Sequence, residues 1–155
     1  TERIQQSTPE KVYTFADLKM SADSGVGIKN YSDALNNIFR EYSLQYSIVE
    51  IFERFLGDGN TVDVAVLADL DPIIKQFDGK IAALLKIGVP KSLATTHLNF
   101  INAMQRVLEN LKAIKLYETD TIAALSAITQ YPENSAGLEA ASINLATMLS
   151  EKLEN

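Results

Sequence analysis

Residues 90–116, PKSLATTHLNFINAMQRVLENLKAIKL, decide the fold class because their apolar side chains recur at helical spacing. Residues three or four positions apart lie on the same face of a helix. The stripe on this face consists of Leu93, His97, Phe100, Met104, Val107, Leu111 and Ile114. It predicts one long amphipathic helix that begins at Pro90 and ends near Leu116. His97, the only histidine in the chain, therefore stands on a face that should be buried.

A first long helix is predicted over residues 32–56, with Ser32 as its N-cap and Gly57 just past its end. Its expected core stripe consists of Leu35, Ile38, Phe39, Tyr42, Tyr46, Val49, Phe52 and Leu56. In the second half of this helix, three more apolar residues widen the apolar surface beyond one stripe: Ile48, Ile51 and Phe55. We interpret these three as a surface covered by the N-terminal segment or by another chain, and hence as candidate interface residues.

Prolines divide the two remaining helical regions. Pro72 is expected at the start of a main helix over 72–87, preceded by a short helix over 61–69. The last helix begins near residue 119 or 120, and Pro132 should break or kink it before it resumes near Ser135.

Short connections between long helices favour an all-α fold, an up-down antiparallel four-helix bundle whose second and fourth helices are split at Pro72 and Pro132. The only segment that alternates in polarity is Val62–Val66, which has no partner strand in the sequence. We assign residues 1–30 to an N-terminal linker or docking segment and residues 31–155 to the bundle domain. In such a bundle the C-terminus returns to the end at which the first helix begins.

Composition excludes several classes of function. The formal charge is -6, from 14 basic and 20 acidic residues, and a net-acidic surface repels nucleic acid and anionic membranes. The chain has no cysteine, which excludes disulfides, thiolate metal sites and cysteine nucleophiles. It also contains no Gly-x-Ser-x-Gly motif and no glycine-rich phosphate loop, so we do not expect an enzyme and assign no catalytic residue.

His97 is the strongest candidate for a functional side chain. It could bind a small ligand in a pocket that Tyr42 and Tyr46 also line, or sense pH. The favoured alternative is a neutral core histidine, hydrogen-bonded to a carbonyl, a hydroxyl or a tyrosine on a facing helix. No metal is expected, because Ala94 stands where a Glu-x-x-His motif needs glutamate and no second histidine exists. We expect no cofactor.

The run from Gly57 to Ile74 contains four aspartates and no lysine or arginine. Numbered from Asp58, it faintly matches a calcium loop, but Asp63 stands where the loop needs glycine. We interpret the aspartates as residues that stabilise helix N-termini.

The run Val89–Asn102, followed much later by Ile122–Leu125 and Tyr131, resembles uncharacterised helical proteins of small-genome candidate-phylum bacteria. Those proteins are exported or membrane-tethered, and the resemblance covers roughly residues 31–150. It implies an extracytoplasmic or cell-surface domain, with any membrane tether outside this chain, and it carries no functional residues across. The leading hypothesis is a non-enzymatic domain for protein interaction or self-assembly; the alternative is a small-molecule sensor with a pocket near His97.

Overall fold

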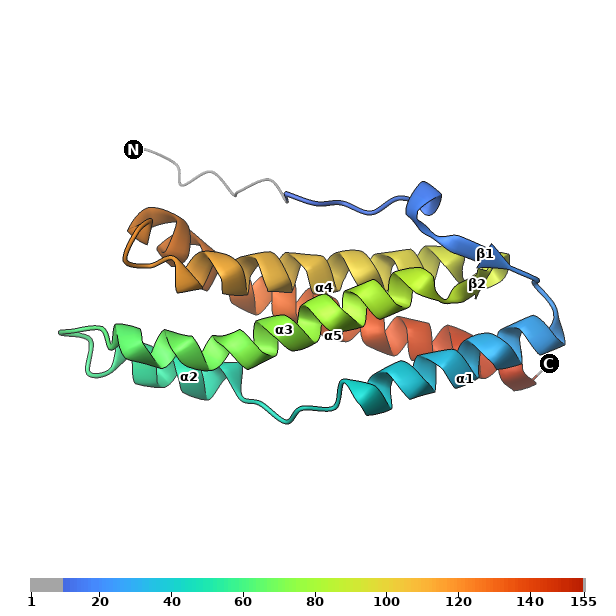
Figure 1. The fold of residues 1–155 in the computed structure, drawn as a ribbon, viewed down its shortest axis with the longest axis horizontal. Helices are drawn as coiled ribbons and strands as arrows, with labels where there is room; N and C mark the ends of the chain where they lie inside the picture. Colours follow the sequence, from blue (N-terminus) through green and yellow to red (C-terminus); the bar gives the residue numbers. More distant parts are fainter. Residues whose placement is uncertain (1–9, 155) are drawn as a thin grey trace.

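The computed structural model describes residues 10–154. It is mostly helical (77%), with five helices and one small two-stranded parallel sheet, so the expected all-α class is confirmed except for the strand pair. Figure 1 shows the helices running roughly along the long axis of the molecule. The elements that build the body are α1 (Gly25–Glu41), α2 (Ile48–Leu56), α3 (Asp71–Lys86), α4 (Ala94–Lys115) and α5 (Thr121–Glu154).

The first predicted helix is wrong in its bounds, because the chain forms two helices there. α1 begins earlier than expected, and Ser24 is its N-cap: the Ser24 hydroxyl oxygen accepts the Gly27 N–H at 3.1 Å. Ser32 is instead a buried residue within α1. Ser47 caps the separate helix α2, which ends as predicted at Gly57, where a positive φ of 54° favours glycine.

Contacts with α3 hold the break at residues 42–47. The Leu44 N–H donates to the Gln76 side-chain oxygen at 2.8 Å, and the Tyr46 ring lies 6.3 Å from the Phe77 ring. Because the break resets the helical phase, the core face of α2 differs from the stripe that a continuous helix predicts. Val49 and Leu56, expected in the core, are exposed.

The candidate interface residues Ile48, Ile51 and Phe55 are the core face of α2, with exposed fractions of 6% or less. Their burial explains the widened apolar surface noted in the sequence: it packs within this chain. The apolar side chains that α2 presents to solvent are instead Val49 and Leu56.

Pro72 acts as predicted, in the first turn of α3, and the preceding short helix is a 3-10 helix, η2 (Val64–Leu70). Pro90 does not begin a helix. It lies in strand β2 (Gly88–Pro90), and a 3-10 turn, η3 (Lys91–Leu93), precedes α4.

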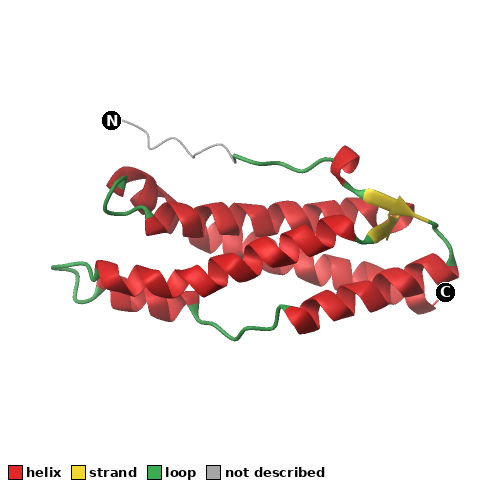
Figure 2. Cartoon of the chain, viewed as in Figure 1, coloured by secondary structure: helices red, strands yellow, loops and turns green. Residues whose placement is uncertain are grey.

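The small sheet was not predicted. β1 (Lys19–Ser21) pairs in parallel with β2, with Met20 opposite Val89, and Figure 2 shows the two strands at one end of the molecule. Gly88 permits this pairing, since a Cβ there would lie 2.8 Å from the Ser21 Cβ. Strands of three residues are too short to show an alternating pattern.

α5 is not split. It continues through Pro132 as one helix, although proline has no N–H to donate to the preceding turn. α5 and α4 form the most extensive helix–helix contact in the described residues. Just after the proline, the Asn134 side-chain N–H donates to the Asn110 side-chain oxygen at 2.7 Å. Tertiary packing thus overrides the local signal.

The chain runs along α1 and α2, returns along α3, runs out again along α4 and returns along α5 (Figure 1). The C-terminal end of α5 therefore lies beside the start of α1, as expected. The boundary proposed after residue 30 falls within α1.

Candidate functional site

His97 is fully buried at the junction of α1, α3 and α4. Its Nε2 lies 3.0 Å from the Leu84 carbonyl oxygen, and its Nδ1 lies 2.8 Å from the Tyr31 hydroxyl. A carbonyl can only accept, so Nε2 carries the proton and Nδ1 accepts the Tyr31 O–H. The two rings also meet edge to face, with their centroids 5.5 Å apart.

Burial keeps this pair neutral. Desolvation lowers the pKa of His97 from 6.5 to about 4, and the hydrogen bond to Leu84 opposes that shift only partly. Burial also raises the pKa of Tyr31 well above its usual value. Both ring nitrogens of His97 are occupied within the protein. The structure therefore matches the core-histidine interpretation, and Tyr31 is the partner that the sequence did not identify.

Among the described residues, the hydrogen bonds and ring contact of His97 involve Tyr31 and Leu84, and neither Tyr42 nor Tyr46. Tyr42 lies against α3 at Gly79, where an added Cβ would meet the Tyr42 Cε1 at 2.5 Å. Tyr46 is exposed beyond one third of its surface and lies against Phe77. Burial raises the pKa of Tyr46, and the nearby Tyr131 raises it further. Both tyrosines therefore pack the 42–47 segment against α3.

The polar side of α4 holds the N-terminal segment. Asn102 makes two hydrogen bonds to the backbone of Tyr13: its Oδ1 accepts the N–H at 2.8 Å and its Nδ2 donates to the carbonyl at 3.0 Å. About two turns further along α4, the Glu109 carboxylate accepts hydrogen bonds from the backbone N–H groups of Glu10 and Lys11 at 2.9 and 3.1 Å. These side chains satisfy backbone groups that would otherwise need water.

An open apolar hollow of about 350 Å³ lies between α1 and the C-terminal half of α5. Its floor consists of side chains that are nearly buried: Leu35, Leu145 and Leu149. Phe39 and Leu153 stand on its edge and are 37% and 50% exposed. We call this hollow the α1–α5 groove. None of His97, Tyr42 and Tyr46 lines it.

Two side-chain spacings on α5 shape the groove. Leu145, Leu149 and Leu153 recur every four residues and form one apolar row along α5, from the floor of the groove to its edge. The small residues Ser142, Ala146 and Ser150 recur at the same interval and leave a shallow channel beside that row. α1 contacts α5 much less than α4 does, which keeps the channel open. A channel of this kind can receive a row of side chains from another helix.

In the described residues 10–154, no three histidine, aspartate or glutamate side chains converge to hold a metal ion. Within the same range, none of the helices combines the length and apolarity needed to cross a membrane. In comparisons with protein-family models, with curated proteins and with solved structures, nothing matches this chain significantly.

Proposed function

We propose that this protein is a non-enzymatic interaction domain that binds an amphipathic helix of a partner protein in the α1–α5 groove. The observation that carries the proposal is the exposed apolar lining of the groove, where Phe39 and Leu153 flank a leucine floor. Helix-in-groove recognition reads apolar side chains at positions i, i+3 or i+4 and i+7. The four-residue spacing of the α5 leucines suits that pattern.

The rim of the groove favours a helix over a small polar ligand. Asn36, Ser142 and Ser150 are exposed and short, so they can bond to polar side chains along the edge of a bound helix while its apolar face covers the floor. The hollow is open along one side, whereas ligand pockets enclose most of their ligand. The sensor function considered from the sequence has no support at His97, where the tyrosine and the carbonyl occupy both nitrogens.

The proposal is tested by displaying peptides tiled across the proteins of the source genome and selecting those that bind the pure domain. Each selection is repeated on Ala146→Trp, which fills the channel, and on Ala140→Trp, an exposed alanine on the same helix outside the groove. We expect amphipathic helical segments that bind the wild type and Ala140→Trp but not Ala146→Trp. Segments that bind all three proteins equally would contradict a role for the groove.

Self-assembly is the competing occupant, since a second copy of this chain could place its own helix in the groove. Size-exclusion chromatography with light scattering, over a range of protein concentrations, decides between a separate partner and a second copy. A monomer supports a separate partner. A dimer that Ala146→Trp dissociates and Ala140→Trp preserves would show that the partner is a second copy.

We propose, further, that the domain acts outside the cytoplasm. Support for this location comes from the resemblance of Val89–Asn102 to exported or membrane-tethered proteins, and from nothing in the geometry. Protease treatment of intact cells tests it, because an exposed domain is degraded in intact cells while a cytoplasmic control protein survives.

A further inference from the structure

The chain has a strongly uneven distribution of charge. Residues 47–71 and 115–125 contain eight of the 20 acidic residues and two of the 14 basic residues, so the rest of the chain has twelve of each. These two segments therefore account for the whole formal charge of -6. We call the surface they form the acidic end.

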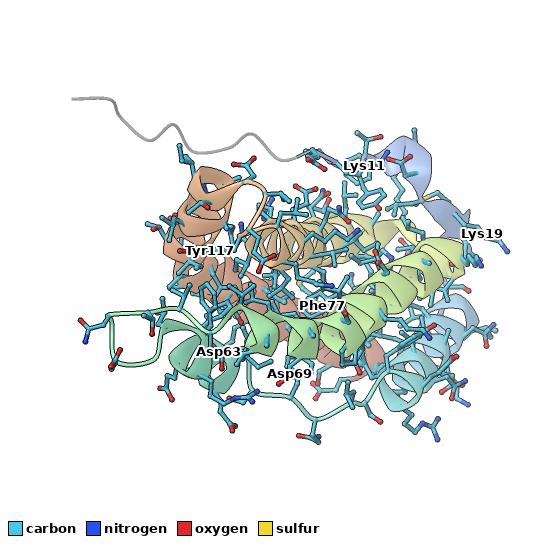
Figure 3. All side chains as sticks on the ribbon, turned by 60° about the vertical axis from the view of Figure 1, so that its left-hand side comes forward. Lys11, Lys19, Asp63, Asp69, Phe77 and Tyr117 are labelled. Carbon is cyan, nitrogen blue, oxygen red and sulfur yellow. The ribbon has the colours of Figure 1, made fainter. Side chains whose placement is uncertain are left out.

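The fold brings the two segments together. The Phe55 and Tyr117 rings lie 5.1 Å apart, and Lys115 forms an ion pair with Asp71. Figure 3 shows Asp63 and Tyr117 at the same end of the molecule, with Lys19 at the other. The acidic end thus lies at the end of the molecule opposite the start of α1 and the C-terminal end of α5 (Figure 1), and none of its residues lines the α1–α5 groove.

Basic side chains do not neutralise the acidic end. Its two basic side chains form ion pairs within this end, Arg54 with Asp69 and Lys115 with Asp71. No ion pair is found in the described residues for the six other carboxylates, which belong to Glu50, Glu53, Asp58, Asp63, Glu118 and Asp120. A partner that approaches this end meets uncompensated negative charge.

The same end exposes apolar side chains. On α2, Val49 and Leu56 are 60% and 42% exposed, and the half-buried Phe52 lies between them on the same stripe, against Tyr131. Helical phase places Glu53, and then Glu50, on the solvent side of this stripe. At the α4–α5 turn, Ile122 is 78% exposed. Val49 and Leu56, with the half-covered Phe52 between them, form an exposed apolar face of α2 that has carboxylates on its solvent side.

We propose that the acidic end is a second docking surface, which binds a basic amphipathic helix of a partner protein along this exposed apolar face of α2. Leucine-like side chains of that helix would cover Val49, Phe52 and Leu56, while its lysines or arginines meet Glu50 and Glu53. Charge complementarity decides the occupant. Nucleic acid and anionic lipid are repelled, and a second copy of this chain offers no surplus of positive charge outside this end.

This inference is independent of the proposed function, since it uses a different surface and a different partner chemistry. The test uses two fluorescent synthetic helical peptides, one of leucine and lysine and one of leucine and glutamate with the same leucine positions. Binding is measured by anisotropy over a range of salt concentrations. We expect the lysine peptide to bind with an affinity that falls as salt increases, and the glutamate peptide not to bind.

Matched variants locate the binding. Glu50→Lys/Glu53→Lys should lower the affinity for the lysine peptide by about tenfold or more, because the reversed charges repel it. Asp33→Lys/Glu151→Lys makes the same change in net charge away from the acidic end, and should alter affinity by less than about twofold. Val49→Ser/Leu56→Ser should also weaken binding about tenfold, whereas Ile143→Ser/Val26→Ser, at exposed apolar positions outside the acidic end, should not.

Three results would overturn the proposal. The first is no binding of the lysine peptide, and the second is equal loss in both charge-reversal variants, which would indicate general attraction. The third is binding of the domain to neutral phosphatidylcholine vesicles that Val49→Ser/Leu56→Ser abolishes, since the α2 face would then contact lipid. Ala146→Trp serves as a further control: it removes the groove and should leave binding of the lysine peptide unchanged.

Discussion

At the scale of single residues, His97 is a polar group whose whole hydrogen-bonding capacity is used inside the fold. It connects α1 through the Tyr31 hydroxyl to α3 through the Leu84 carbonyl, from its own place on α4. The sequence could place His97 on a buried face, because the stripe around it is regular. It could not identify Tyr31 as the partner, because that contact joins residues 66 positions apart.

The neutral state of His97 makes stability depend on pH. Between pH 6.5 and about 4 the unfolded chain binds a proton at this histidine that the folded protein does not, so stability falls as the pH falls. The contribution is about 3 kcal/mol when fully lost. We predict that His97→Leu lowers stability at pH 7 and flattens this part of the profile, measured by urea unfolding at several pH values. If the free energy of unfolding of the variant changed with pH as it does in the wild type, the assignment of a neutral, buried His97 would be contradicted.

Two helical glycines should respond oppositely to alanine. A Cβ at Gly79 meets the Tyr42 ring at 2.5 Å, whereas at Gly137 it meets nothing within 4 Å. Gly137→Ala should therefore stabilise the protein by about 0.5–1 kcal/mol through helix propensity. Gly79→Ala should destabilise it by about 1–3 kcal/mol, because Tyr42 must move. Thermal unfolding of the two variants checks both signs, and stabilisation by Gly79→Ala would show that Tyr42 does not hold the 42–47 segment against α3.

At the scale of elements, the sequence predicts helices well where one stripe governs them and poorly where tertiary contacts decide. α4 and the start of α3 at Pro72 follow from local signals. The break at 42–47 does not, because it depends on Gln76 and Phe77 of another helix. The strands β1 and β2 are too short to leave a pattern. At Pro132 the sequence predicts a break that the structure does not have, because packing on α4 keeps α5 continuous.

The hydrogen bond between Asn134 and Asn110 is expected to help hold α5 through the proline. Asn110 is buried, so Asn134→Ala leaves its oxygen without that donor and should cost about 1–3 kcal/mol. Asn144→Ala, at an exposed position on the same helix, should change stability by less than about 0.5 kcal/mol. Urea unfolding measures both. Equal effects would mean that this contact contributes nothing beyond general packing.

At the scale of the whole molecule, the fold separates two kinds of surface. The acidic end lies opposite the start of α1 and the end of α5 (Figure 1), and the α1–α5 groove is lined by the second half of α1 and the C-terminal half of α5. The run of aspartates between Gly57 and Ile74 is evident in the sequence, but its meeting with the α4–α5 turn requires the fold. The groove was equally beyond sequence reasoning, because it depends on how far α1 and α5 separate.

Binding in the α1–α5 groove is tested by calorimetric titration of one selected helical peptide into the wild type, Ala140→Trp and Ala146→Trp. Both substitutions place the same large side chain on exposed positions of α5, so they differ only in whether the groove is filled. We expect Ala140→Trp to bind the peptide within about twofold of the wild-type affinity and Ala146→Trp to bind it at least about tenfold more weakly. Equal affinity for the two variants would contradict binding in the groove.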